Sequence, residues 1–411
     1  MHNDSLKKFH SKFMISIIGV VSIIIISPPL FNNANIKLLC QLLMLIWIFK
    51  ALLRRPFAFF HPTKGVFAVY ILIFISVFRY FIDTSAFYNQ QYTSIYIYCF
   101  FVIVFSTVKN YEELNCYKPI LWLLLLIIPI WTIISIQEGL MDPYLFRHLS
   151  GSGLADNSYF SSKGVVGYDF IYASVPMITI LFGLLFSKAI KKWQMLILLI
   201  NLISALFLLY IANYGIAFFA MLISLIVFFS ARMKMKTNQE LIIFCSLLFC
   251  LSMSVILYYK EILEWLMRIF ANTYYIVKLN SIYEYAIVGN EFGRMETYLS
   301  SLKAFINNPL FGIGFNSAYI GMHSVILDKF AELGFFGGLA TVVVLLNVFQ
   351  KKIFKHSGLA FRTNAAVLIA NLIIFTFNPM GTVISVIIYA IFAVAQIYLT
   401  NESVKVRVEN K

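Results

Sequence analysis

Two side chains in the segment 294–338, Arg294 and His323, are of types that can do chemistry together. Arg294 opens a stretch with helical spacing, so its guanidinium and the free N–H groups of a helix start can converge on one anion such as a phosphate. His323 can exchange a proton near neutral pH and can therefore take one from a sugar hydroxyl. The segment thus offers an anion site and a proton acceptor.

Each of these side chains also has a purely structural interpretation. Arg294 could pair with Glu291 or Glu296, as many loop arginines do. His323 could donate to a backbone carbonyl and do nothing more. The sequence between them, Asn-Pro-Leu-Phe-Gly-Ile-Gly-Phe at 308–315, contains glycines that let the backbone turn tightly or approach a ligand. Residue types alone leave both interpretations open.

The elements that must position these side chains are membrane helices. The chain is 61% hydrophobic and only 12% charged, with a mean hydropathy of +0.85, a composition typical of a polytopic membrane protein. We therefore predict an all-α protein that forms one membrane domain over residues 1–411. About twelve apolar segments are long enough to span a bilayer; they are 13–31, 36–53, 66–83, 92–108, 119–136, 169–187, 194–211, 215–231, 240–258, 329–349, 363–378 and 382–399.

The distribution of basic residues predicts the orientation of the spans. With a cytoplasmic N-terminus, most Lys and Arg residues fall in inner segments, whereas the short outer connections at 32–35, 84–91, 212–214 and 379–381 hold none. An even number of spans then places both termini in the cytoplasm, and we expect the first span to be retained rather than cleaved. The net charge of +14 is explained by this orientation and by attraction to anionic membrane lipid, without nucleic acid.

Two predicted outer segments, 137–168 and 259–328, are much longer than the other outer connections, and long ordered loops are usually functional. The first is rich in Gly, Ser, Asn and Asp, groups that suit a sugar-like ligand, although a flexible solvated loop has the same composition. The second contains two stretches with helical spacing, 261–280 and 294–306. These could pack on the membrane domain or lie in the headgroup region. Arg294 and His323 both belong to this region.

Arg79 is a charged residue inside a predicted span, near its outer end. Such a residue is either functional or extends its side chain to the membrane surface. The five cysteines show no metal-ligand spacing and none falls in a predicted outer segment, so we predict neither a metal site nor a disulfide framework.

The combined pattern resembles that of the O-antigen polymerase and O-antigen ligase superfamily. It consists of Arg294-x3-Tyr298, then 308–315, then His323-Ser324, nine residues, and Gly334-x-x-Gly337. In that family the histidine is followed by Asn, Ser or Gln, nine residues, Gly, two residues, and Gly, Thr or Tyr. The chain matches every specified position. Direct resemblance covers 294–338, and the layout of spans with one large late outer loop extends it loosely to the full chain.

The resemblance implies a GT-C-type glycosyltransferase that uses neither metal nor cofactor and acts at the outer face of the bacterial inner membrane. Its donor would be an undecaprenyl-diphosphate-linked oligosaccharide, and a chain-length regulator protein is a further possible partner. Carried over, Arg294 would bind the diphosphate and His323 would activate or orient the acceptor hydroxyl. Gly334 and Gly337 would permit close helix packing, and the motif also includes Gly312, Gly314 and Ser324.

The chain departs from the family pattern at one place. Many relatives carry an arginine in a Ser/Thr-Arg-Gly/Ala element near the outer start of the eighth span, where this chain reads Ile-Ala-Asn-Tyr-Gly at 211–215. Arg79, Arg147, Arg268 or Lys278 could supply the second phosphate contact. We favour Arg79 and Arg147, since a fixed span and a polar outer loop can reach the same cavity.

Three functions are compatible with the sequence. We favour a polymerase, whose acceptor is another lipid-linked repeat unit. The alternative within the family is a ligase, whose acceptor is the lipid A core. A lipid-linked oligosaccharide flippase is the alternative from another class, but its site should lie between helices at the membrane midplane. In this chain the polar residues instead gather in the predicted outer loops.

Overall fold

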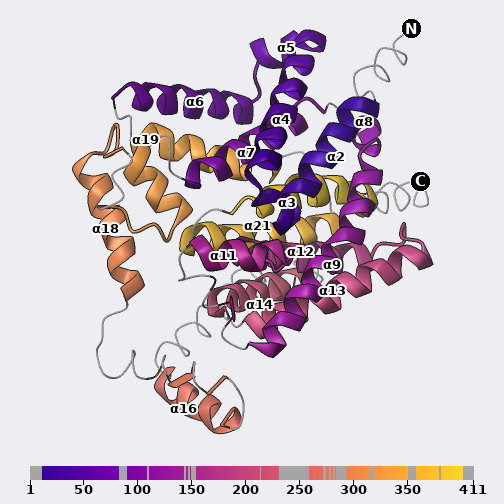
Figure 1. The fold of residues 1–411 in the computed structure, drawn as a ribbon, viewed down its shortest axis with the longest axis vertical. Coiled ribbons are helices and arrows are strands. Elements are labelled where there is room, and N and C mark those ends of the chain that lie inside the picture. The colour runs from indigo at the N-terminus through magenta and orange to yellow at the C-terminus, as the bar shows by residue number, and fades with distance from the viewer. Residues whose placement is uncertain are drawn as a thin grey trace, which may run out of the picture.

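The computed structural model describes most of the chain, and all of its regular elements are helices. The described residues are 12–82, 90–108, 111–142, 145–146, 149, 154–212, 214–230, 259–271, 275–276, 279–280, 283, 293–314, 319–349, 358–378 and 381–400. Figure 1 shows most of these helices gathered into one body, with α16 set apart below it.

Residues 12–141 supply the first helices of the chain, drawn from indigo towards magenta in Figure 1. They are α2 (Lys12–Ile26), α3 (Pro28–Phe31), α4 (Ala34–Arg54), α5 (Pro56–Phe60), α6 (Lys64–Ile82), α7 (Gln90–Ser106), α8 (Tyr111–Asn115) and α9 (Lys118–Met141). The predicted span 13–31 is broken between Ile26 and Pro28, because prolines favour the first turn of a new helix. Asn33 then caps α4 by accepting the N–H groups of Asn35 and Ile36.

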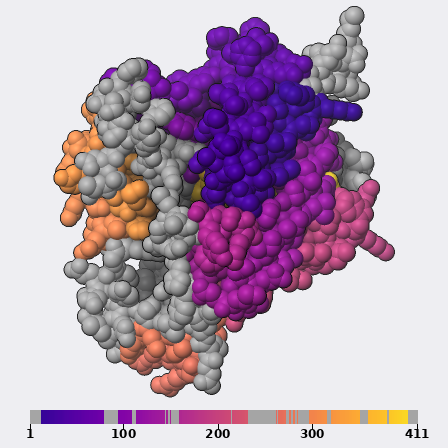
Figure 2. Space-filling view, in the orientation of Figure 1, coloured from indigo at the N-terminus to yellow at the C-terminus, as the bar shows by residue number. Residues whose placement is uncertain are grey.

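Residues 154–392 supply further helices of the membrane domain and the two helices of the predicted outer segment 259–328. They are α11 (Leu154–Ser162), α12 (Tyr168–Leu185), α13 (Lys192–Ala212), α14 (Gly215–Ser230), α16 (Tyr259–Ile269), α18 (Gly293–Asn307), α19 (Val325–Leu346), η3 (Asn347–Phe349), α21 (Leu359–Phe377), α22 (Val383–Val386) and the π-helical η4 (Ile387–Phe392). In Figure 2 the N-terminal helices and the magenta helices that follow them form one continuous face.

Among the residues that the structure describes, seven helices are long and apolar enough to cross a membrane, which confirms the prediction of an all-helical polytopic membrane protein. They are Ala34–Arg54, Glu113–Met141, Tyr168–Leu185, Lys192–Ala212, Val325–Phe349, Leu359–Phe377 and Val383–Thr400. Four shorter apolar helices coincide with further predicted spans, namely Lys12–Ile26, Lys64–Phe78, Ser94–Ser106 and Gly215–Ser230. The predicted span 240–258 lies outside the described residues, so the total of twelve stays a prediction.

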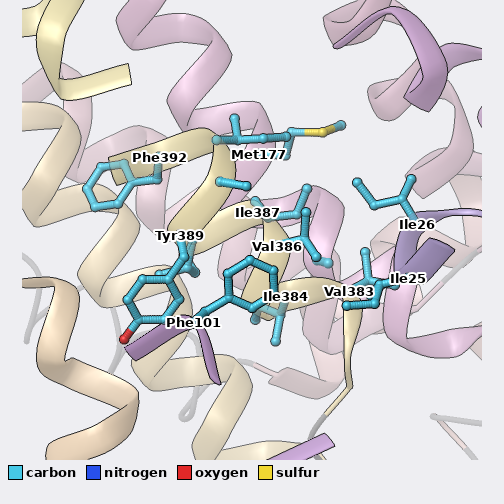
Figure 3. Packing of buried hydrophobic residues seen from close by; sticks show 14 of the residues in the cluster. Ile25, Ile26, Phe101, Met177, Val383, Ile384, Val386, Ile387, Tyr389 and Phe392 are labelled. Carbon is cyan, nitrogen blue, oxygen red and sulfur yellow. The ribbon is translucent and has the colours of Figure 1, made fainter. Parts of the chain in front are cut away.

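The last apolar helix, Val383–Thr400, forms the centre of the core. Every residue of its most apolar stretch is buried, whereas only 17% of the corresponding stretch of Ala34–Arg54 is. A helix that is apolar on all sides can be surrounded either by lipid or by other helices, and in this protein other helices surround it. Figure 3 shows Tyr389 beside Phe101, with their rings stacked at 6.2 Å between centroids. The segment that matters for function lies elsewhere, where α18 and α19 pack together along one edge of the body.

Candidate functional site

His323 lies immediately before α19 and is half-buried. The helix begins at Val325 because Ser324 is its N-cap, with the Ser324 hydroxyl accepting the Leu327 N–H at 3.1 Å. The Ser324 N–H in turn donates to Oδ2 of Asp328 at 3.0 Å. The motif serine therefore has a clear structural role, since it fixes the backbone that carries His323.

A serine of the preceding helix holds the other side of the histidine. The Ser301 hydroxyl donates to Oδ1 of Asp328 at 2.6 Å and accepts the Gly321 N–H at 2.9 Å. Both side chains are buried, with Ser301 at 0% and Asp328 at 3% exposure. A Cβ at Gly321 would lie 2.0 Å from the Thr297 carbonyl oxygen, so only glycine allows this close approach. We call Ser301 and Asp328, which bind the backbone on both sides of His323, the Ser301–Asp328 clamp.

The C-terminal end of α21 is a third support for the same segment. The Val325 N–H donates to the Asn378 carbonyl at 3.1 Å. The Tyr298 hydroxyl donates to the neighbouring Phe377 carbonyl at 3.0 Å, and the Tyr298 and Phe377 rings meet edge to face. The tyrosine of the Arg-x3-Tyr motif therefore fastens α18 to the helix end that also holds the start of α19.

The glycine at 334 breaks α19 near its middle. Its backbone has φ 69° and ψ −167°, which is not helical and is accessible mainly to glycine. The Phe335 N–H turns away from its own helix and donates to the Pro309 carbonyl at 2.7 Å. The carbonyls of Ala331 and Glu332 accept the N–H groups of Ile313 at 2.8 Å and Gly314 at 3.1 Å. The loop 308–314 thus satisfies backbone groups that the break leaves without helical partners.

This pairing explains why the loop and the break both contain glycines. A Cβ at Gly334 would lie 2.2 Å from the Leu310 oxygen, and one at Gly312 would lie 2.5 Å from the Glu332 carbonyl. Gly312 and Gly314 also have positive φ. We expected Gly334 and Gly337 to allow close packing of helices. The structure instead gives Gly334 a contact with loop backbone, and the atom nearest a Cβ at Gly337 belongs to Leu333 of the same helix.

Three buried charges on the first turns of α19 escaped the sequence analysis. Besides Asp328, they are Lys329 and Glu332, which form an ion pair with both side chains 3% exposed. A buried ion pair of this kind needs both partners, because removing one leaves an uncompensated charge. The predicted span 329–349 begins inside this cluster and divides it between loop and helix, although three charges within five residues beside a span indicate a functional or buried site.

The structure places only some of the predicted phosphate ligands. Arg294 is the second residue of α18, as its helical spacing predicted, but its side chain lies outside the described residues. Arg79 belongs to α6 and its side chain also lies outside them, as do Arg147 and Lys278 altogether. Arg268 lies in the last turn of α16. Within the described ranges, no cluster of three or more His, Cys, Asp or Glu could hold a metal ion.

The described part of the site is therefore a histidine held on two sides by buried hydrogen bonds, next to a broken helix and the glycine loop that completes it. Such an arrangement can hold a proton acceptor in a fixed position at the start of a helix. No model of a known protein family matches the chain, and no curated protein is significantly similar to it in sequence.

Proposed function

We propose that the protein polymerises lipid-linked oligosaccharide repeat units of a surface polysaccharide such as O-antigen. It would transfer the glycan from an undecaprenyl-diphosphate donor to a sugar hydroxyl of another lipid-linked unit, at the outer face of the bacterial inner membrane. The proposal includes twelve spans in a GT-C-like arrangement, with both termini in the cytoplasm. The observation that carries it is the convergence of the motif on one helix: the loop 308–314 binds the backbone of α19 on both sides of Gly334, and Ser324, next to His323, binds the first turn of the same helix.

The chemistry assigned to this unit is a displacement at the anomeric carbon of the donor sugar. The acceptor hydroxyl oxygen forms the new glycosidic bond, and its proton passes to the His323 imidazole. The bond between the anomeric carbon and the diphosphate oxygen breaks, and the electron pair leaves with undecaprenyl diphosphate. Arg294 is assigned to the diphosphate, where a fixed positive charge stabilises the negative charge that develops on the leaving group.

The hydrogen bonds around His323 support this assignment. A proton acceptor works only if it stays within hydrogen-bonding reach of the hydroxyl, so its backbone must be fixed before the substrate arrives. The Ser301–Asp328 clamp and the Asn378 carbonyl fix Gly321, Ser324 and Val325.

A deletion strain that carries wild type, His323→Ala or Arg294→Ala at matched expression tests the proposal, with His61→Ala as control. His61 is an exposed histidine after α5 and has no assigned role. We expect wild type and His61→Ala to give a full ladder of surface polysaccharide on a gel. His323→Ala and Arg294→Ala should give the core with a single repeat unit.

The same gel distinguishes the alternatives. Loss of every surface repeat, with lipid-linked polymer accumulating inside the envelope, would identify a ligase instead. Loss of all outer-face glycan without such polymer would identify a flippase. An unchanged ladder in both variants would mean that Arg294 and His323 have structural roles, and the proposed function would be wrong.

A further inference from the structure

Three tyrosines that the proposed chemistry does not use lie together beside the His323 segment. Tyr168 and Tyr172 are one turn apart at the start of α12, and Tyr214 directly precedes α14. Their ring centroids are 4.6 Å apart for Tyr168 and Tyr172, 5.2 Å for Tyr168 and Tyr214, and 5.6 Å for Tyr172 and Tyr214. Tyr172 is buried, whereas the other two are half-exposed. We call these three residues the tyrosine cluster.

Hydrogen bonds hold the two half-exposed rings in place. The Tyr168 hydroxyl donates to Oδ1 of Asn378, and the Tyr214 hydroxyl donates to the Phe146 carbonyl, each at 2.6 Å. Tyr172 stacks on Tyr214 with an angle of 20° between the ring planes. The rings are therefore fixed before any ligand arrives, which lowers the entropy lost on binding.

The tyrosine cluster is joined to the proposed catalytic histidine through one residue. The side-chain Oδ1 of Asn378 accepts the Tyr168 hydroxyl, and the backbone carbonyl of Asn378 accepts the Val325 N–H. Val325 follows His323 by two residues, a stretch that reaches at most about 7 Å. Asp169 strengthens the connection, because its Oδ2 accepts both the N–H and the hydroxyl of Thr382, four residues after Asn378.

The Asn378 amide nitrogen supplies a second observation. Asn378 is 0% exposed, and among the residues that the structure describes no hydrogen-bond acceptor reaches its Nδ2. This donor belongs to the same carboxamide that Tyr168 binds through Oδ1, so it lies at the edge of the tyrosine cluster. A buried donor without a partner is unfavourable, and an oxygen atom brought in by a ligand would relieve that cost.

We propose that the tyrosine cluster and Asn378 form the subsite for one sugar ring of the acceptor glycan. A sugar ring has faces with C–H groups, which pack on aromatic rings, and a rim of hydroxyl oxygens, which accept hydrogen bonds. Tyr168 and Tyr214 supply the aromatic surface, Tyr172 supports it, and Nδ2 of Asn378 donates to one oxygen of the sugar. The assignment to the acceptor rests on the proposed function, in which His323 activates the acceptor hydroxyl.

Elongation assays on purified protein in nanodiscs test this subsite. The donor is the lipid-linked repeat unit, purified from a strain without the protein and held at constant concentration. The acceptor is the free repeat-unit oligosaccharide, released from the same lipid by mild acid and varied. Binding of that oligosaccharide is measured separately in the His323→Ala background, where no product should form.

We expect Tyr168→Ala and Tyr214→Ala to raise both the acceptor KM and the Kd by about five- to tenfold, with a much smaller change in kcat. Tyr168→Phe keeps the ring and should have a smaller effect than Tyr168→Ala. Asn378→Asp keeps an acceptor for Tyr168 and removes the N–H donor, so it should also raise KM. The control is Tyr159→Ala, because Tyr159 is an exposed tyrosine of α11 outside the tyrosine cluster.

The two measurements separate this inference from the proposed function. If wild type elongates the oligosaccharide and the variants of Tyr168, Tyr214 and Asn378 show unchanged KM and Kd at equal folded amounts, the subsite is wrong and the polymerase stands. If wild type binds the oligosaccharide more tightly than these variants but never elongates it, the subsite stands and the polymerase is wrong.

Discussion

Ser301 and Asp328 are joined by a buried hydrogen bond of 2.6 Å that links α18 to α19. Each of the two side chains also accepts a backbone N–H group close to His323 in the chain. Ser301 accepts that of Gly321, two positions before the histidine, and Asp328 accepts that of Ser324, directly after it. The position of the histidine backbone therefore depends on two residues that no motif search would select.

We expect Ser301→Ala and Asp328→Ala to weaken polymerisation, although neither residue is assigned a contact with substrate. Each removes a buried hydrogen bond and leaves a buried polar group unpaired, at a cost of about 1–3 kcal/mol. The measurement is chain elongation by purified variants, together with their thermal stability. Ser300→Ala is the matched control, because the Ser300 hydroxyl binds only the Thr297 carbonyl of its own helix in the described contacts. Full activity of Ser301→Ala at wild-type stability would exclude a positioning role for the clamp.

Gly334→Ala should fold poorly, because the new Cβ would meet the Leu310 oxygen at 2.2 Å in addition to adopting an unfavourable φ. Gly358→Ala separates the two effects. Gly358 also has a positive φ, of 84°, but nothing lies within 4 Å of its Cβ position. That control should lose about 1–3 kcal/mol of stability, the cost of its backbone conformation alone. Folded yield after membrane extraction and the Tm of each variant are the readouts, and equal losses would argue against the close approach.

The ion pair between Lys329 and Glu332 should behave as a unit. Lys329→Met alone leaves a buried carboxylate without its partner, and we expect a loss of roughly 3–5 kcal/mol in stability. The double variant Lys329→Met, Glu332→Leu removes both charges and should recover much of that loss. Thermal unfolding of the two single variants and the double variant measures this coupling. Additive losses would show that the charges do not stabilise each other.

The second phosphate contact is tested with Arg79→Ala and Arg147→Ala, separately and together. If either residue supplies the contact, its variant should give shorter and less abundant surface polymer at matched expression. The reason is that the variant lacks one positive charge that would stabilise the leaving diphosphate. Gel ladders of complemented cells provide the readout. Full polymer length and amount in both variants would shift the assignment to Arg268 or Lys278.

The helical membrane fold could be predicted from the sequence because long apolar segments have few other stable structures. The start of α18 at Gly293, next to Arg294, was also predictable from helical spacing. The break in α19 was not. Gly334 is one glycine among several, and its positive φ becomes necessary only when the loop from Pro309 supplies the backbone partners.

The supports of the candidate site were unpredictable for a related reason. Asn378 is the last residue of a predicted span and looks like an ordinary helix end, yet it binds residues 53 and 210 positions away, Val325 and Tyr168. Neither periodicity nor composition carries information about such distant pairs. The buried charges could have been recognised from the sequence, because Asp328 and Lys329 stand at the edge of a long apolar segment. The structure makes both of them part of a span.

The docking of the loop 308–314 onto the break in α19 has a consequence for biosynthesis. A helix that loses its regular hydrogen bonds at Gly334 carries exposed polar backbone, which a lipid environment does not satisfy. The loop precedes the helix in the chain, so the ribosome completes it first. When α19 emerges, the groups that pair with its broken turn have already been made, so this turn needs no later segment to satisfy its backbone in the bilayer.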